Sequence, residues 1–181
     1  MIRCSNSPVK IACAIAVLVA VAASAGAQTR GELMRLVGRT VPGTVVAVAD
    51  GDTIRIRFDG SDTSVRVRLE GIDAPERGEP FSTQARNAAR VMLSGKRVQA
   101  KAVDVDNYDR LVARVIVNGA DSSVHLIESG LACHFTRFAT DPGLANAQLN
   151  ARRAGKGFWA ANAGKPACVK FVDRPSPRGA R

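Results

Sequence analysis

Three separated segments of this chain combine acidic side chains with arginine or a tight turn, a combination suited to phosphate chemistry. They are residues 50–53 (Asp-Gly-Asp-Thr), residues 67–76 (Val-Arg-Leu-Glu-Gly-Ile-Asp-Ala-Pro-Glu) and residues 106–110 (Asp-Asn-Tyr-Asp-Arg). Hydrolysis of a phosphodiester needs a nucleophile, neutralisation of charge on the phosphate oxygens and help for the leaving oxygen. Carboxylates that hold a hard cation meet the second need. The three segments therefore predict a metal-assisted phosphate site.

Two aspartates are the candidate metal ligands. Asp52 and Asp73 are both expected at strand ends, where neighbouring strands of one sheet bring them together. Ligation by oxygen alone favours calcium over zinc. The histidines and the cysteines also lack the spacing of a zinc site. Ca²⁺ is thus the expected cofactor.

The motifs D-G-D-T, R-x-x-x-x-D-x-P-E and Y-x-R follow one another in this order along the chain. In this respect the chain resembles the staphylococcal nuclease-like (thermonuclease) family, over about residues 43–159. The resemblance implies a calcium-dependent nuclease that acts on DNA and RNA with little sequence preference and leaves 3′-phosphorylated products.

The resemblance also implies a role for each motif residue. The implied metal ligands are Asp52, Asp73 and the main-chain carbonyl of Ala74. Arg68 and Arg110 match the arginines that bind the phosphate, and the planar guanidinium suits bidentate contact with phosphate oxygens. Glu76, held by the fixed turn at Pro75, is implied to orient or deprotonate the attacking water, and both roles stay open.

Three further positions bear on substrate binding. Tyr108 matches a family residue that contacts a substrate phosphate. Where the family offers tyrosine or tryptophan as a stacking wall, this chain has Phe138 and Phe135, and we expect Phe138 to stack a base and Phe135 to lie in the core. Asp109 replaces a glycine of the family, so its charge could weaken the phosphate contact of Arg110.

Each segment alone also has a structural explanation, as a hairpin turn or a surface ion pair. Two other functions therefore remain open. The chain could be a catalytically weak or inactive nucleic-acid-binding module of OB type, or a membrane-tethered basic protein that binds anionic polymers of the envelope. The motif residues taken together favour the nuclease, because a binding module has no chemical need for them.

The elements that must position these residues are mainly strands. Alternating apolar residues predict a three-stranded meander over residues 44–69 and two further strands at 98–105 and 111–117. Helices are expected from Ser82, which can cap the first, and at 123–128 and 142–154. Five strands with a helix between the third and fourth predict an α+β fold, a five-stranded OB-type β-barrel with about three helices.

The first 27 residues have the features of a cleaved signal peptide: a basic start, an apolar run at 11–23 and small residues at 25–27. We therefore expect a secreted or periplasmic protein without stable membrane association after cleavage. The expected organisation is a signal peptide at 1–27, a lead-in at 28–42, a nuclease domain at 43–169 and a disordered basic tail at 170–181.

Charge and cysteine content fit this location. The signal holds two of the 26 basic and none of the 16 acidic residues, so the remaining chain keeps a net charge of +8. Such a charge favours polyanionic partners, here DNA and RNA, and we expect a monomer. Cys133 and Cys168 remain after cleavage, and an even pair in an exported protein predicts a disulfide.

Overall fold

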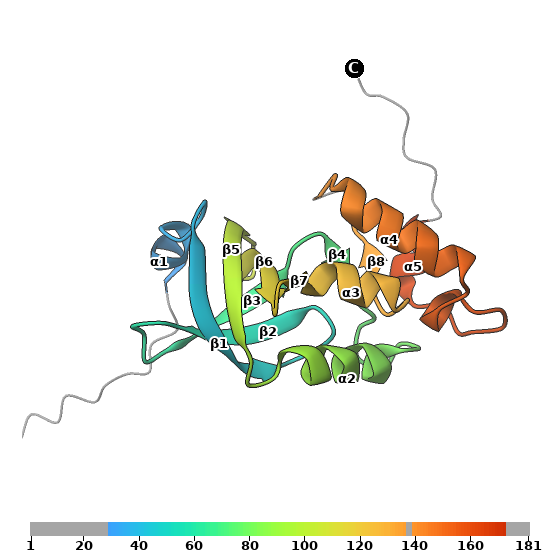
Figure 1. Cartoon of the computed structure of the whole chain (residues 1–181), viewed down its shortest axis with the longest axis horizontal. Helices are drawn as coiled ribbons and strands as arrows, with labels where there is room; N and C mark the ends of the chain where they lie inside the picture. Colours follow the sequence, from blue (N-terminus) through green and yellow to red (C-terminus); the bar gives the residue numbers. More distant parts are fainter. Residues whose placement is uncertain (1–28, 137–138, 173–181) are drawn as a thin grey trace, which may run out of the picture.

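The main sheet closes into a barrel, seen at the left of Figure 1 in a computed structural model that describes residues 29–136 and 139–172. The sheet order is β3-β2-β1-β5-β6-β7, and a parallel pairing of β3 with β6 closes five of the strands into the barrel. The strands are β1 (Thr40–Val48), β2 (Thr53–Phe58), β3 (Ser64–Leu69), β5 (Arg97–Val105), β6 (Leu111–Val117) and β7 (Ala120–Asp121). The predicted five-stranded OB-type barrel is confirmed.

Period-2 alternation explains why these segments form a barrel. In β2, Ile54, Ile56 and Phe58 are buried whereas Arg55 and Arg57 are exposed. The other barrel strands bury alternate residues in the same way, and their inward side chains fill one continuous apolar core. Burial of these side chains is the main stabilising term of the fold.

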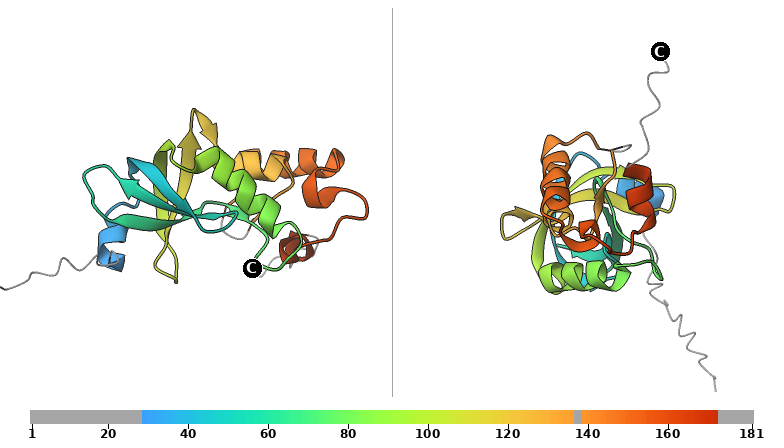
Figure 2. Two further views of the ribbon diagram at one scale, coloured as in Figure 1. Left: turned by 90° about the horizontal axis from the view of Figure 1, so that it is seen from below. Right: turned by 90° about the vertical axis from the view of Figure 1, so that its right-hand side faces the viewer.

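The helices, more numerous than expected, flank the barrel and extend beyond it (Figures 1 and 2). About three were predicted, and the described residues contain five: α1 (Arg30–Met34), α2 (Ser82–Leu93), α3 (Ser122–Glu128), α4 (Pro142–Arg153) and α5 (Ala167–Val172), with a 3₁₀ turn at Gly157–Trp159. Helix α5 was not predicted from the sequence. Among residues 29–136 and 139–172, no helix is long and apolar enough to cross a bilayer.

The limits of the folded part differ slightly from those predicted. Strand β1 begins at Thr40 rather than Thr44, and α1 lies within the predicted lead-in, where Leu33 joins the core. At the other end, α5 continues to Val172, so the chain is helical for three residues past the expected end of the domain at 169. The predicted signal peptide and residues 173–181 lie outside the described residues.

The start of α2 corrects one prediction. Ser82 is the first helical residue rather than the cap, and the preceding Phe81 adopts φ 67° with no side-chain hydrogen bond to the helix. The Phe81 ring instead packs edge-on against Phe158, with centroids 6.0 Å apart. Aromatic packing therefore fixes the entry to this helix.

A small second sheet joins the barrel to the C-terminal helices. It pairs β4 (Ile72–Asp73) with β8 (Cys133–His134), so that Asp73 lies opposite Cys133. The predicted disulfide between Cys133 and Cys168 is present, with Cα atoms 6.0 Å apart, and it ties α5 to β8. The strand that carries Asp73 is thus supported by both β8 and α5.

Candidate active site

The turn between β1 and β2 presents the first acidic residue. Asp50 Oδ1 accepts the N–H groups of Asp52 (3.1 Å) and Thr53 (2.7 Å), so the Asp50 side chain closes the turn on itself. Aspartate commonly makes such bonds to the backbone two or three residues further on. The Asp52 side chain is held at the start of β2 as a result.

Gly51 lets this turn approach two other elements. A Cβ atom added at Gly51 would lie 2.6 Å from the Cβ of Ala74 and 2.9 Å from the Cβ of Ala85 in α2. Neither distance is tolerable, so the close contact of the turn with the segment after β4 requires glycine here. The glycine thereby brings Asp52 close to Asp73.

Asp52 is buried and has several partners. Its Oδ2 accepts the Ala74 N–H (2.7 Å), its Oδ1 accepts the Thr53 hydroxyl (3.1 Å), and Oδ1 also pairs with Arg68. Burial raises the pKa of the Asp52 carboxyl to about 7, although the positive charge of Arg68 acts in the opposite direction. Burial therefore disfavours the ionised form of this carboxylate, and the neighbouring charge of Arg68 favours it.

Arg68 lies between the two candidate metal ligands. Its side chain pairs with Asp52 and, through Nη2, with Asp73 Oδ1 at 2.8 Å, and Nη2 also donates to the carbonyl oxygen of Ile72 (3.1 Å). Burial lowers the pKa of Arg68, but the two carboxylates outweigh this effect and raise it. Sequence reasoning placed Arg68 at the phosphate and missed its contacts with the aspartates.

The closed barrel places the second arginine in the same site. Leu111 of β6 lies opposite Val67 of β3, so Arg110, which precedes Leu111, lies beside the same hairpin that carries Thr53 and Arg68. Arg110 Nη1 donates to the Thr53 hydroxyl (3.2 Å), which in turn donates to Asp52. Arg110, Thr53 and Asp52 therefore form one connected chain.

The turn between β5 and β6 orients Arg110. Asp106 Oδ1 accepts the N–H groups of Tyr108 (2.9 Å) and Arg110 (3.0 Å), and Oδ2 accepts Arg110 Nε (2.7 Å). Burial alone would raise the pKa of Asp106, but the bonds from Arg110 and Tyr108 outweigh it and lower the pKa. The Tyr108 ring is exposed and its centroid lies 5.4 Å from the Arg110 guanidinium carbon, which is compatible with a substrate contact.

Asp109 pairs with an arginine that was not among the predicted site residues. It adopts φ 54°, a conformation that glycine would accept more readily, and its carboxylate is 3.3 Å from Arg30 Nη1. Arg30 also donates to the carbonyl oxygens of Val105 (3.0 Å) and Asp106 (2.5 Å). The charge of Asp109 is therefore paired with Arg30, and Arg110 is paired with Asp106.

The structure does not connect Glu76 to the other site residues. Glu76 lies three residues after Asp73 and is exposed, and its carboxylate makes no hydrogen bond or ion pair with any described residue. Its N–H donates to Glu79 Oε2 (2.9 Å), while Glu79 Oε1 accepts the N–H of Ala167 at the start of α5 (3.1 Å). Glu79, which sequence reasoning missed, therefore shapes this turn and leaves Glu76 free to face a ligand.

The oxygen atoms around the Arg68 guanidinium show whether this site has the ligands that a calcium ion needs. Asp52, Asp73 and the Ile72 carbonyl surround the Arg68 guanidinium, so the donor set suits a hard cation. No group of three acidic, histidine or cysteine side chains that could hold a metal occurs in the described part of the chain. Two carboxylates and main-chain oxygen are the kind of ligands that calcium accepts, but here they pair with Arg68, and both the ion and the Ala74 carbonyl as its ligand stay predictions.

The phenylalanines give less information on substrate binding. Phe138 lies outside the described residues, so its predicted stacking role stays a prediction. Phe135, expected in the core, is half-buried, and its N–H donates to the carbonyl oxygen of Gly71 (2.8 Å).

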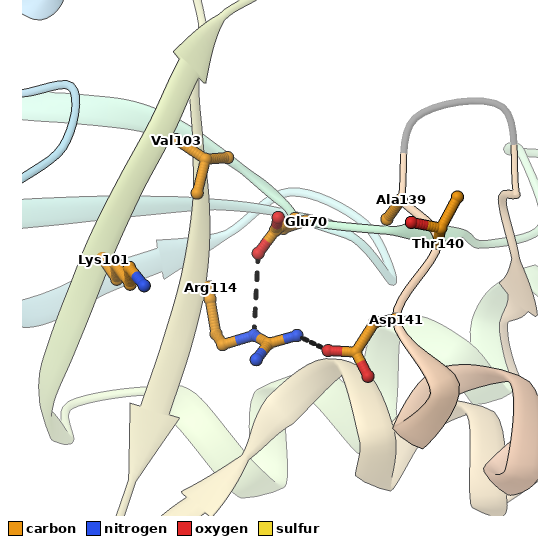
Figure 3. Close-up of a pocket in the computed structure, with 7 residues that line it drawn as sticks. All are labelled: Glu70, Lys101, Val103, Arg114, Ala139, Thr140 and Asp141. Atoms are coloured by element: carbon orange, nitrogen blue, oxygen red, sulfur yellow. Dashed lines mark hydrogen bonds and ion pairs between the residues drawn. The ribbon is translucent and has the colours of Figure 1, made fainter.

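A separate pocket is held together by structural ion pairs (Figure 3). Arg114 pairs there with Glu70, Asp121 and Asp141. Asp121 and Asp141 are the N-caps of α3 and α4, so their carboxylates are already used to begin these helices. Arg114 thus fixes two helices to the barrel, and the pocket contains none of the predicted site residues.

Comparisons with known proteins place this geometry in a family. The model of the staphylococcal nuclease homologues matches residues 66–161. A probable staphylococcal-like nuclease, CAN1, from Oryza sativa subsp. japonica is 35% identical over 97 residues, which are 54% of this chain and 29% of the relative. An uncharacterized endonuclease from Haemophilus influenzae is 31% identical over 118 residues, 65% of this chain and 66% of the relative.

A third relative matches over more of the chain. The protein ParB from Escherichia coli is 34% identical over 171 residues, which cover 88% of each chain. The chain therefore spans less than a third of the rice relative, about two thirds of the Haemophilus relative and most of ParB.

Proposed function

This chain belongs to the family of staphylococcal nuclease homologues, and from that premise we propose that it is an exported, calcium-dependent phosphodiesterase that hydrolyses DNA and RNA with little sequence preference. One observation carries the proposal. Residues from three separated segments, Asp52, Asp73, Arg68 and Arg110, meet in one network of hydrogen bonds and ion pairs. A module that only binds nucleic acid would not need this combination.

Asp52 and Asp73, with the main-chain carbonyl of Ala74, would hold the calcium ion. The ion would neutralise charge on the phosphate and polarise it for attack. Arg68 now pairs with both carboxylates, so it would share their oxygens with the ion. Removing the Arg68 charge should therefore strengthen calcium binding even where it weakens hydrolysis.

The arginines would act on the phosphate. Arg68 and Arg110 offer planar donors for the non-bridging oxygens, and their positive charge stabilises the charge that accumulates in the transition state. Arg110 is held at its Nε by Asp106, and this bond leaves part of its guanidinium for the substrate. A side chain fixed in this way loses little entropy when it binds the transition state.

Glu76 would act on the attacking water, as a base or as an orienting group. It follows Asp73 and Ala74 in the same turn, and its carboxylate is unpaired among the described residues and exposed, so it can accept a proton from a water at the phosphate. The water oxygen would bond to phosphorus while the bond from phosphorus to the 5′-oxygen breaks. The 5′-oxygen would leave with a proton, so the products would carry 3′-phosphates and 5′-hydroxyls.

Export and assembly belong to the same proposal. Residues 1–27 would direct the chain out of the cytoplasm, to the periplasm or the medium, and the Cys133–Cys168 disulfide is consistent with an oxidising compartment. The remaining chain would act as a monomer without stable membrane association.

A single experiment separates the nuclease from a binding module. Labelled DNA and RNA are incubated with residues 28–181, and both retention on a filter and cleavage are measured, with the product ends identified by enzymatic labelling. We expect cleavage of both substrates to 3′-phosphorylated fragments. Retention without cleavage would support the binding module, and fragments with only 5′-phosphates would contradict the proposed chemistry.

A further inference from the structure

The outer face of the β2–β3 hairpin carries arginines that the proposed reaction does not use. Arg55 and Arg57 on β2 and Arg66 on β3 are exposed, because alternation points them away from the barrel core. The strand register places Arg55 directly opposite Arg66 and Arg57 opposite Ser64. Three positive side chains therefore lie on one small area, which we call the arginine track.

The track has no internal compensation for its charge. Arg55, Arg57 and Arg66 form no ion pair with any described residue, and Arg55 reaches only the Ser64 hydroxyl, at 3.5 Å. The exposed Arg97, in contrast, pairs with a carboxylate: it donates two hydrogen bonds to Asp59, at 2.6 and 2.7 Å. Like charges directly opposite each other on paired strands destabilise a sheet. Repulsion between these arginines therefore lowers the stability of the free protein, and a bound polyanion would relieve the repulsion.

Protection of a sheet edge does not explain these charges. Charged residues often guard exposed edge strands against aggregation. Strand β2, however, pairs with β1 and β3, and β3 pairs with β2 and β6, so both are internal strands of the closed barrel. A ligand for the track explains the charges better than protection of an edge.

The track continues directly into the candidate active site. The next pair of residues along the same face of the hairpin is Thr53 opposite Arg68. Residues two apart on a strand are separated by about 6.5–7 Å. Arg66 therefore follows Arg68 along β3, and Arg55 follows Thr53 along β2, without an apolar side chain on this face between them.

We propose that the arginine track binds the sugar–phosphate backbone of the nucleic-acid strand that runs away from the cleaved phosphate. Arginine favours phosphate oxygens through its planar fork, and the three arginines lie in register with Arg68 on the same face of the hairpin. The track would raise affinity for long substrates and leave the chemical step unchanged. This inference rests on the proposed function of the neighbouring site.

The test neutralises the three arginines of the track together and compares this variant with one that loses three positive charges at other surface positions. The variant R55Q/R57Q/R66Q is matched with R39Q/R153Q/K156Q, three exposed basic residues outside the β2–β3 hairpin. Binding of a long labelled oligothymidylate is measured at several salt concentrations, and hydrolysis is measured for this substrate and for a dinucleotide. Melting temperatures show whether each variant is folded.

Loss of three phosphate contacts should weaken binding of the long strand by about 10–100-fold at 0.1 M salt. The slope of the logarithm of the binding constant against the logarithm of the salt concentration should become smaller in magnitude by about 2. The dinucleotide should be hydrolysed at the wild-type rate, and the control variant should change the slope far less. Equal slopes in the two variants would overturn the proposal. So would an equal loss of activity on the dinucleotide. Binding to phosphatidylserine vesicles is measured in parallel, and a variant that loses only this binding would also overturn the proposal.

Failure of the two proposals can be told apart. If the wild type cleaves neither substrate, the proposed function is wrong, but the binding comparison still tests the track. If the wild type cleaves both and the two variants bind alike, only the track is wrong.

Discussion

Arg68 pairs with both aspartates, Asp52 and Asp73, that were predicted to bind a metal, and these ion pairs hold the individual residues of the site together. The motif predicted which residue types would be present, and the structure brings Asp52, Asp73, Arg68 and Arg110 together. Asp73, however, lies in the small second sheet and not, as was expected, on a neighbouring strand of the sheet that follows Asp52. The pairing of Arg68 could not be predicted, because it depends on how close the two-residue strand β4 lies to the Asp52 turn. The hydrogen bonds from Arg110 to Thr53 and from Thr53 to Asp52 could not be predicted either, because they depend on closure of the barrel.

The variant Arg110→Ala should lose rate far more than affinity. Its guanidinium is expected to stabilise charge that develops in the transition state, so kcat should fall by about 10²–10³-fold while DNA binding changes little. Stopped assays of kcat and filter binding measure the two effects.

Asp106→Asn provides the control for that variant. It keeps Arg110 but removes the charge that orients it, so its loss of kcat should be smaller. Nearly normal kcat in Arg110→Ala would show that this arginine does not take part in the chemistry.

The two glutamates of the 76–79 turn should separate catalysis from stability. Glu76→Gln should lower kcat by about 10²–10⁴-fold and leave the melting temperature unchanged, because its carboxylate has no described partner to lose. Glu79→Gln should instead lower the unfolding free energy by about 1–2 kcal/mol, since its carboxylate accepts two N–H groups. A destabilised Glu76→Gln variant with normal kcat would reverse the two roles.

At the scale of elements, tight turns and one small sheet hold the site. Strands of six or more residues were predictable because their alternation is long enough to read, as in β6, whose bounds match the prediction. Strands β4 and β8 have two residues each, too few to show a period, and α5 is a short helix. The entry to α2 was mispredicted because the ring contact of Phe81 with Phe158 joins residues far apart in the sequence.

Gly51→Ala should damage both the fold and the site. Its new Cβ would overlap Ala74 and Ala85, so we expect a loss of about 1–3 kcal/mol of unfolding free energy and weaker calcium binding by Asp52. Chemical denaturation and calorimetric titration measure these effects. Gly31→Ala is the matched control, because nothing lies within 4 Å of its Cβ position in α1. Equal stability of the two variants would show that the turn does not need glycine.

Removal of the disulfide should affect stability more than activity. Cys133 and Cys168 are 35 residues apart, and the chain-entropy model gives about 3–4 kcal/mol for such a loop. The double serine variant should therefore melt at a lower temperature but still hydrolyse DNA. Reduction of the wild type should reproduce the shift, and an unchanged melting temperature in both would contradict a stabilising bond.

At the scale of the whole molecule, closure of the barrel is what makes a site from distant segments. The parallel pairing of β3 with β6 places Arg110 near Asp52, and the disulfide-linked C-terminal helix supports the strand of Asp73. The strand order predicted the barrel, because five strands with one helix between the third and the fourth are typical of an OB-type fold. The net positive charge of the chain favours association with polyanions in general.

The dependence of hydrolysis on calcium tests the central claim most directly. The initial rate on plasmid DNA is measured for residues 28–181 with excess chelator and with increasing calcium, in parallel with Asp52→Asn/Asp73→Asn. The account predicts no cleavage in chelator, a saturable rise with calcium in the wild type, recovery when calcium is restored, and little activity in the double variant. Full activity in chelator, or equal calcium response in the double variant, would contradict it.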